Sequence, residues 1–495
     1  MSIGRYRFGD SIHRGPLGAV RPGQAALGLA GAVWAIACLD LSPSGTGLLA
    51  GVSGLLIALA SATMPVGGRT VEQWVPVVCG WLTSLVSGRA RSICRPPGTS
   101  VTLLSGDSSR VLVRDGASPP LRALGAARIV GVDYRGGLVG AVSERRGRRL
   151  TSVLVAKAPG FALADLDEQE QRLAVWASVL QAAAHGAVRR IAWVQRTAPA
   201  QGDGLARWLY DQRDPDIDLA SDRIARSYLE LMAHSAQAVQ DHEVLIAVQV
   251  DTARLRRDHP GELQRALISA CERVASGLER ARVRTDRALT PGGLARALRV
   301  GYDPYAHAHL AALRAAGRGD ELTERSAWPA AASESWGSYQ VDAAVHATFE
   351  IAGWPRTDVG PAFLSPLLTG GTHVRSVAVC FAPLDPRRSL AQAEADVTRS
   401  ETDRHQRHRL GQIETARHRQ AQDATHQRES ELAAGHTEVR LAGYITVTGT
   451  DPDELEQACE ETITLAARSH LELRRLYGQQ AHAFTFTLPL CRGLK

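Results

Sequence analysis

The most constraining feature of this chain is a long apolar stretch near its N-terminus, where Asp40 is the one charged residue between Arg21 and Arg69. The sequence DLSPSG divides the stretch into two segments, roughly 23–40 and 46–65, and each has about the 20 apolar residues that a helix needs to cross a membrane. Serine and proline suit a tight turn between them, in which Asp40 can reach water. We therefore expect a transmembrane helical hairpin over 23–66.

Two other interpretations of the apolar stretch are weaker. A cleaved signal peptide fits poorly, because a second apolar segment follows the first and no clear cleavage site precedes a polar start. A soluble hairpin buried in a protein core is also disfavoured, since such hairpins usually have a polar face. A membrane anchor explains both segments together.

The arginines predict the orientation of this anchor. Residues 1–100 carry eight arginines against three acidic residues, and this segment holds most of the net charge of +6. The arginines flank the apolar stretch and are absent from its turn, so the positive-inside rule places both termini in the cytoplasm. We expect a multi-pass protein of the inner (plasma) membrane, with residues 1–22 as a cytoplasmic N-terminus. Seven cysteines without a CxxC pair agree with a reducing compartment.

The sequence TMPVGGRTVEQW, residues 63–74, marks the end of the second apolar segment. Its proline and paired glycines break the helix, and apolar residues then recur at helical spacing from Val71. Because tryptophan favours the headgroup layer, we interpret 67–90 as an amphipathic helix on the inner membrane surface; the alternative is a core helix of the next domain. The residues expected at the membrane or its interface are Trp34, Asp40, Pro65, Gly67, Gly68, Arg69, Trp74 and Trp81.

The remainder of the chain has the pattern of a cytoplasmic α+β region. RSICRPPGTS, residues 91–100, is typical of a linker, and alternating strand and helix patterns follow it. We expect an α+β domain over 101–330 and a second α+β part over 331–495, as mixed α/β layers that form two ferredoxin-like halves. The segment AHAFTFTLPL, near the C-terminus, is predicted to be a closing strand.

The region 386–436 within the second part is different. From Asp396 to Glu431 its large aliphatic residues are Val397, Leu410 and Ile413, and it contains no proline. A helix that is polar on every side bridges solvent, needs a partner or is weak. We predict a projecting helix or helical hairpin, broken near Gly411 or around 420–425. We expect this segment either to bind a partner subunit or an acidic polymer, or to be a solvated spacer.

The sequence offers little for catalysis. It contains no Walker phosphate-binding motif, no GxGxxG after a strand, no GxSxG and no HExxH. His405 and His408 form an i,i+3 pair, but exposed histidines explain them better than a metal site. We therefore predict no enzyme activity, no cofactor and no metal, with a membrane-tethered enzyme of unknown reaction as an alternative. Direct nucleic-acid binding by the arginine-rich helix is disfavoured, because acidic residues are interleaved and aromatic residues are absent.

Three stretches together resemble a known group of membrane proteins. The apolar hairpin followed by PVGGRTVEQWVPVVCGWL is similar to the PrgI-like membrane proteins of Gram-positive conjugation and secretion clusters. Residues 341–368 and 443–494 resemble actinobacterial proteins that join such an anchor to a region similar to the non-motor N-terminal part of TraC/TrbE/CagE-class ATPases. Such chains are also described as EccE-like, after a membrane subunit of type VII secretion. The best-matching residues are Pro65, Gly67, Gly68, Arg69, Trp74, Trp354, Pro355, Leu476, Tyr477, Gly478, Gln479 and Phe484.

This resemblance implies a non-catalytic inner-membrane subunit of a type IV or type VII secretion or conjugal transfer apparatus. In the motor class a Walker-bearing domain follows the matched region, and this sequence has no Walker motif, so the motor is expected on another polypeptide. The implied partners are a separate Walker-type ATPase, other apparatus subunits and further copies of this chain in an oligomer. The candidate partner-docking residues are Arg474, Arg475, Tyr477, Gly478 and Gln479.

Overall fold

The structure of the protein is a computed structural model. It describes residues 22–64, 67–88, 90–93, 122–157, 160–199, 222–224, 226–228, 230, 240–255, 261–307, 309–310, 312, 316–317, 327–409 and 416–494. Residues 1–21 of the predicted cytoplasmic N-terminus (1–22), Pro65 and most of the predicted linker lie outside the described residues.

Two apolar helices, α1 (Pro22–Leu41) and α2 (Gly45–Thr63), form a hairpin. Both are long and apolar enough to cross a membrane, and only 6% and 17% of their most apolar windows are buried. A core helix of a soluble protein would be mostly buried, so the hairpin is not part of the folded core. The two helices approach closely at Gly51, where a Cβ would lie 3.1 Å from the Ala35 carbonyl oxygen. Small residues allow this kind of contact between membrane helices.

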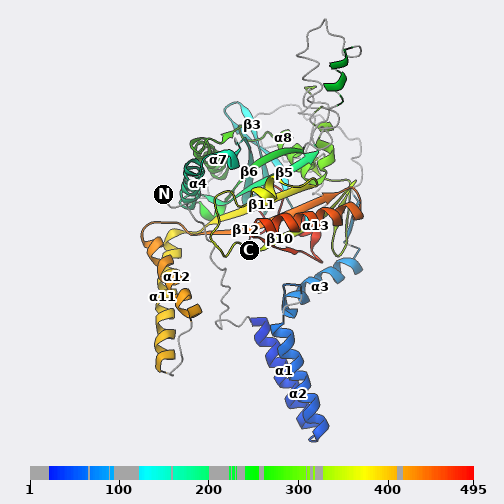
Figure 1. Ribbon diagram of the computed structural model, residues 1–495, viewed down its shortest axis with the longest axis vertical. Coiled ribbons are helices and arrows are strands. Elements are labelled where there is room, and N and C mark those ends of the chain that lie inside the picture. The colour runs from blue at the N-terminus through cyan, green and yellow to red at the C-terminus, as the bar shows by residue number, and fades with distance from the viewer. Residues whose placement is uncertain are drawn as a thin grey trace.

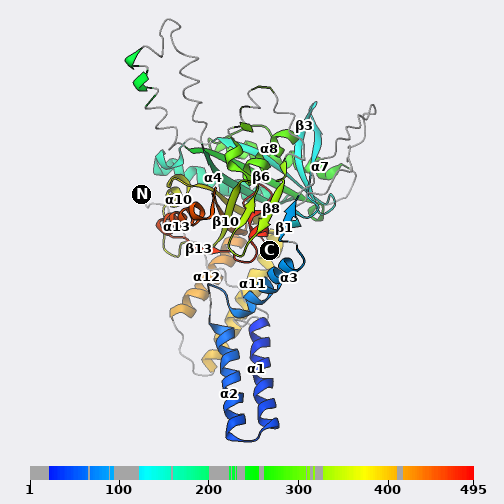
Figure 2. The same ribbon diagram turned by 90° about the vertical axis from the view of Figure 1, so that its right-hand side faces the viewer.

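The polypeptide leaves this hairpin through two glycines in the left-handed conformation, Gly67 (φ 59°) and Gly68 (φ 76°). Glycine adopts this conformation without a steric cost. The predicted helix break is therefore found at these two glycines. Helix α3 (Val71–Val86) follows, and it lies across the junction between the hairpin and the rest of the protein (Figure 2).

A 13-stranded sheet forms the centre of the molecule (Figure 1). Its strand order is β1-β8-β9-β10-β12-β11-β5-β6-β4-β3-β2, with β13 also paired to β10 and β7 to β4, and every pairing is antiparallel. The strands are β1 (Arg91–Ile93), β2 (Arg128–Tyr134), β3 (Gly137–Glu144), β4 (Arg149–Lys157), β5 (Val188–Pro199), β6 (Gln240–Asp251), β7 (Arg284–Thr285), β8 (Ala331–Glu334), β9 (Tyr339–Val341), β10 (Ala344–Gly353), β11 (Val374–Pro383), β12 (Val439–Gly449) and β13 (Glu472–Arg475).

Four strands and two helices follow one another along the chain in the same order in each half of the sheet. The chain runs β4–α4–β5–β6–α7–β7 in the first half and β10–α10–β11–β12–α13–β13 in the second. The spatial order is β7-β4-β6-β5 in one half and β13-β10-β12-β11 in the other. The halves meet where β5 pairs with β11, so one continuous sheet contains strands from both predicted cytoplasmic parts. The helices are α4 (Leu166–Ala184), α7 (Glu262–Arg280), α10 (Ser365–Thr369) and α13 (Pro452–Arg468).

Helices cover both faces of the sheet. On one face, α4 and α7 pack on the first half through residues such as Val274 and Ile246, and α10 and α13 pack on the second half. On the other face lie α8 (Pro291–Tyr302), the short helix α14 (Gln480–Phe484) and the C-terminal segment, with Leu298, Phe484 and Leu490 in the core. The expected mixed α/β architecture is thus present, and the described strand pairs of its sheet are antiparallel.

The prediction of a closing strand at AHAFTFTLPL is wrong. Residues 480–484 form helix α14, and the residues after it are irregular. The alternating apolar side chains Phe484, Leu488 and Leu490 are buried against the face of the sheet. The edge position beside β10 is already occupied by β13, so the segment covers the sheet instead of extending it.

The polar region forms two helices, α11 (Pro386–Arg409) and α12 (Ala416–Ala433), which pack side by side. Along the chain they lie between β11 and β12. This bears out the predicted helical hairpin, and its break at 410–415 lies outside the described residues. Arg428 fixes the base, since it contacts Asp396 at 3.0 Å and Glu438 at 2.9 Å. In both views this hairpin leaves the sheet on the same side as α1–α2 (Figures 1 and 2).

Candidate functional site

Residues from two predicted sets, those expected at the membrane interface and those expected to dock a partner, come together in the structure. They meet at the junction between the start of α3 and strand β13. The Arg474 Nη1 donates to the carbonyl oxygen of Gly68 at 2.9 Å, and its Nη2 donates to the Glu350 carboxylate at 2.6 Å. Glu350 is the direct cross-strand neighbour of Arg474 on β10. One guanidinium therefore joins the exit of the α1–α2 hairpin to the second half of the sheet.

An aromatic cluster strengthens this junction, with Trp336 from the β8–β9 turn at its centre. Its ring stacks on Trp74 of α3 at 6.0 Å between centroids and meets Trp81 edge-on at 5.1 Å. The Trp336 ring also stacks on Tyr477, with 6.3 Å between the ring centroids. These are favourable aromatic geometries, and each pair adds about 0.5–1.5 kcal/mol beyond the area that it buries. The aromatic cluster of Trp74, Trp81, Trp336 and Tyr477 thus packs α3 against the sheet.

Gly478 has two reasons to be glycine. Its φ is 70°, and a Cβ would lie 2.6 Å from Cζ3 of Trp336 and 3.0 Å from Cγ1 of Val77. The backbone after Tyr477 therefore passes directly beneath the aromatic cluster. A side chain here would push α3 away from the sheet.

Arg69 lies in the same junction. Its guanidinium is 5.5 Å from the centre of the Trp74 ring, which is cation–π distance. With the Gln479 amide oriented by its hydrogen bonds, its oxygen accepts from Nη1 and Nη2 of Arg69 at 3.1 and 2.8 Å. Burial and the positive charge of Arg474 lower the pKa of Arg69, and Glu350 opposes them.

Arg475, a predicted docking residue, is engaged within its own chain. Its Nη1 and Nη2 donate to the two carboxylate oxygens of Glu456 on α13, both at 2.8 Å, and its Nε donates to the Gly337 carbonyl at 2.9 Å. This bidentate pair holds the pKa of Glu456 below its ordinary value. Partner docking by Arg475 stays a prediction, while its contacts fix the β13 end against α13.

The other end of the junction joins α3 to α1. The Glu72 side chain lies against Gly23 in the first turn of α1 and leaves no room there for a Cβ. A carboxylate is favourable at this position because the N-terminus of a helix carries a partial positive charge. The Gln24 Nε2 donates to the Ala62 carbonyl at 2.8 Å. This bond joins the start of α1 to the end of α2, so the open end of the α1–α2 hairpin lies beside α3.

The remaining predicted interface residues lie on exposed surfaces. The Trp34 side chain packs over Gly54 of α2 and is 58% exposed, and Asp40 is exposed at the end of α1. A second face of α3 is also apolar and open. It contains Val75, Leu82 and Val86, which are 53%, 46% and 87% exposed.

Three residues at the junction were missed by the sequence analysis, namely Glu72, Trp336 and Glu350. Trp336 stands out in the sequence as a tryptophan in a Gly/Ser-rich turn. Its partners lie more than 250 residues earlier and more than 140 residues later. Periodicity reveals contacts within one element only, so it gave no sign of this cluster.

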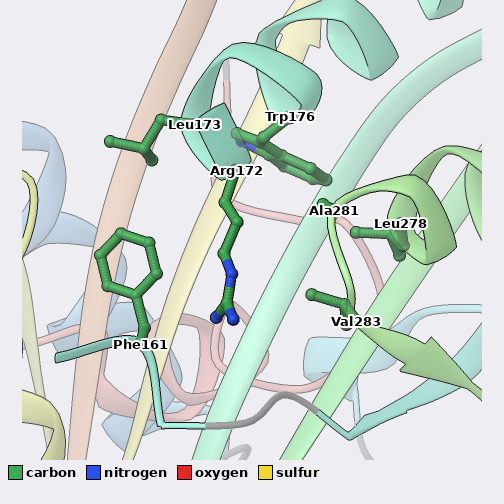
Figure 3. A pocket seen from close by; sticks show the side chains of 7 residues that line it. All are labelled: Phe161, Arg172, Leu173, Trp176, Leu278, Ala281 and Val283. Carbon is green, nitrogen blue, oxygen red and sulfur yellow. The ribbon is translucent and has the colours of Figure 1, made fainter. Parts of the chain in front are cut away.

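A separate hollow of about 170 Å³ lies between α4 and the end of α7 (Figure 3). Its walls are almost entirely apolar, and Arg172 is the one titratable side chain among the lining residues. The Arg172 Nη2 donates to Glu168 at 2.7 Å. The lining residues are Phe161, Arg172, Leu173, Trp176, Leu278, Ala281 and Val283. They supply no nucleophile and no general base.

Other chemistry was sought in the part of the chain that the structure describes. No group of three or more His, Cys, Asp or Glu residues there could hold a metal ion. Cys271, Cys380, Cys459 and Cys491 are buried free thiols, and Cys79 on α3 is exposed. Burial raises the pKa of the Cys271 thiol to about 12, which leaves it unreactive. Comparison of the chain with protein-family models and with curated proteins finds no match.

Proposed function

We propose that this chain is a non-catalytic, multi-pass subunit of the inner (plasma) membrane in a bacterial secretion or conjugal transfer apparatus. Its α1–α2 hairpin spans the membrane, and its sheet lies at the cytoplasmic face, where a separate translocation ATPase docks. The observation that carries this proposal is the direct connection of an exposed apolar hairpin, through α3, to a large folded domain.

The exposure of α1–α2 supports the membrane anchor. Leu29, Ile36, Leu49 and Ile57 are between 67% and 70% exposed on the hairpin surface. Each such side chain costs about 1.5–3 kcal/mol when it is left in water instead of an apolar medium. A bilayer removes this cost along the whole hairpin.

The geometry of the junction supports an orientation with both termini in the cytoplasm. The start of α1 and the end of α2 lie together, joined by the hydrogen bond from Gln24 to Ala62. Arg69 follows these ends immediately, and arginines favour the cytoplasmic side. The open apolar face of α3, with Val75, Leu82 and Val86, would then lie on the inner membrane surface.

The sheet supports a role as a platform. The order β7-β4-β6-β5 and its counterpart β13-β10-β12-β11 are those of the βαββαβ unit, which favours the interpretation of two ferredoxin-like halves. Arg474 and the aromatic cluster tie the second half to the anchor. An ATPase bound to this sheet would therefore be held at a fixed place relative to the membrane.

Membrane fractionation tests the anchor. The full chain is expected in the membrane pellet after an alkaline carbonate wash and in solution only with detergent. A Leu56→Arg variant, which puts a charge near the middle of α2, should reduce this retention, because a central arginine costs about 2.5–3.5 kcal/mol in insertion. The matched variant Leu163→Arg changes a leucine that is 92% exposed on the sheet domain and should fractionate normally. Recovery of the unmodified chain without detergent contradicts the proposal.

Affinity purification tests the role in an apparatus. The tagged full chain, extracted in mild detergent from its own cells, is expected to bring down a Walker-type ATPase that mass spectrometry identifies. The purified chain alone should show no ATP hydrolysis. A measurable ATPase rate that falls when one acidic residue is replaced would instead favour the membrane-tethered enzyme.

A further inference from the structure

Arginine is concentrated along one edge of the sheet, where five neighbouring strands begin or end. The strand ends at this edge are Arg128 of β2, Glu144 of β3, Arg149 of β4, Asp251 of β6 and Val188 of β5. Because adjacent strands lie about 4.8 Å apart, the edge is about 19 Å long. We call these strand ends and the residues directly beside them the arginine edge. Its charged residues are Arg128, Arg145, Arg146, Arg148, Arg149, Arg189, Arg190, Arg254 and Arg492, with the two carboxylates Glu144 and Asp251.

The two carboxylates of the arginine edge are already paired within the chain. Asp251 accepts from Nε of Arg149 at 2.7 Å and from Nη1 of Arg189 at 3.0 Å. Glu144 accepts from Nε of Arg492 at 2.8 Å. Burial lowers the pKa of Arg189, and the charges of neighbouring arginines lower it further. The edge therefore keeps an excess of positive charge after its own ion pairs have formed.

The turn between β3 and β4 carries the most accessible part of this charge. Arg145, Arg146 and Arg148 are exposed, and within the described part of the chain none of the three contacts a carboxylate. Arg145 and Arg146 also have positive φ, 49° and 58°. Glycine, asparagine and aspartate are preferred at such turn positions, because a larger side chain strains the backbone. Two arginines held there at a conformational cost indicate that their charge is used.

We propose that the arginine edge binds the phosphate backbone of duplex DNA, with Arg145, Arg146 and Arg148 as its main contacts. This inference goes beyond the proposed function, which includes no nucleic acid, and it does not depend on the membrane anchor. The planar guanidinium group matches two oxygens of one phosphate, and each contact releases counterions from the DNA. An edge of about 19 Å covers about five base pairs at 3.4 Å each.

Duplex DNA fits this surface better than a protein or a single strand. The centre of a protein interface usually contains aromatic or large apolar anchors. Among the described residues of the arginine edge there is no exposed large apolar side chain. Its described residues also include no aromatic ring on which an unpaired base could stack. Contacts to the backbone alone bind DNA without sequence preference.

Fluorescence anisotropy tests the proposal, with the purified full chain in nanodiscs of phosphatidylcholine and a short labelled DNA duplex. We expect a Kd of about 10⁻⁶–10⁻⁴ M at physiological salt and a binding constant that falls linearly with salt on a logarithmic plot. No binding, or binding that salt does not weaken, would overturn the proposal. Displacement of the duplex by polyglutamate at equal charge concentration would show that the edge takes an acidic polypeptide, and would also overturn it.

A triple variant of the turn locates the site. Arg145→Gln with Arg146→Gln and Arg148→Gln should weaken DNA binding by about tenfold or more. It should also lower the slope of the salt dependence by about 3, because each phosphate contact contributes about 0.9 to that slope. Thermal unfolding should be unchanged, since the three side chains are exposed.

A second triple variant is the matched control. Arg280→Gln with Arg284→Gln and Arg287→Gln removes the same charge from exposed positions. Arg284 pairs with Lys157, at the opposite end of β4 from the arginine edge. This variant should keep nearly the full affinity and slope. Equal losses in the two triple variants would mean that DNA responds to the net charge of the whole chain, and would overturn the proposed site.

The membrane anchor and the arginine edge fail separately. A chain that stays in the membrane pellet but binds no duplex would refute this inference alone. A chain that binds the duplex through the turn but leaves the membrane without detergent would refute the proposed function and leave this inference intact.

Discussion

At the scale of single residues, His346 illustrates a polar side chain that the core accepts in one protonation state. It is fully buried on β10, where its Nε2 contacts the Tyr302 carbonyl at 3.0 Å and its Nδ1 contacts the Thr448 hydroxyl at 2.9 Å. The carbonyl can only accept, so Nε2 carries the proton and Nδ1 accepts from Thr448. Burial lowers the pKa of His346 to about 4, and the neutral ring is therefore the native form.

This pKa predicts a defined pH dependence of stability. Because the folded pKa lies below the unfolded value, the unfolded chain binds the proton first and stability falls as the pH decreases from about 6.5 to about 4. The full effect of this one group is about 3 kcal/mol. We expect His346→Gln to remove this part of the slope in denaturant unfolding measured across that pH range. An unchanged slope would show that the pKa of His346 is the same in the folded and the unfolded chain.

Gly478 gives a second residue-scale prediction, with Gly435 as its matched control. Both have positive φ, but a Cβ at Gly478 meets Trp336 and Val77, whereas a Cβ at Gly435 meets nothing within 4 Å. Each alanine variant should lose about 1 kcal/mol from backbone strain. Gly478→Ala should lose a further 1–3 kcal/mol or so through overpacking. Equal losses in thermal unfolding would mean that the contact beneath Trp336 is not tight.

At the scale of elements, α3 depends on tertiary contacts for its position. One face packs on Trp336, which in turn stacks on Tyr477, and a second, with Val75, Leu82 and Val86, is open. We expect Trp336→Ala to increase amide exchange across α3 several-fold, because the helix loses its main contact with the sheet. Trp176→Ala, which removes an aromatic contact with Phe381 on another part of the sheet, should leave α3 exchange unchanged. If the amides of α3 exchange at the same slow rate in both variants, the aromatic cluster does not hold the helix in place.

Several elements could be predicted from local pattern alone. The apolar hairpin, the helix break at Gly67 and Gly68, and the strands β10 and β11 carry their signals in neighbouring residues. The C-terminal segment misled the prediction, because alternating apolar residues such as Phe484 and Leu488 suit both a strand and a chain that lies across a sheet. Which of these forms depends on whether the edge beside β10 is free, and β13 occupies it.

The candidate site was predictable only in pieces. Arg69 and Trp74 were expected at the membrane, and Arg474 and Tyr477 at a partner. The structure places these residues at one junction. Arg474 donates to the Gly68 carbonyl across about 400 positions of sequence, and Trp74 and Tyr477 both stack on Trp336. A contact at that separation depends on the strand order of the sheet, and one sequence contains no local sign of it.

At the scale of the whole molecule, the proposed function depends on one arrangement of the chain in the membrane. In the proposed arrangement the α1–α2 hairpin crosses the membrane, its turn faces outward, and the sheet lies at the inner face with α3 between them. The residues that distinguish this arrangement are Ser44 in the turn and Cys79, an exposed thiol on α3. They should lie on opposite sides of the membrane.

Thiol labelling in whole cells tests this arrangement most directly. A Ser44→Cys variant of the full chain is treated with a membrane-impermeant maleimide, before and after the cells are permeabilised, and modified peptides are identified by mass spectrometry. We expect position 44 to be labelled in intact cells and Cys79 to be labelled only after permeabilisation. Labelling of Cys79 in intact cells, or protection of position 44 until the cells are opened, would contradict this arrangement.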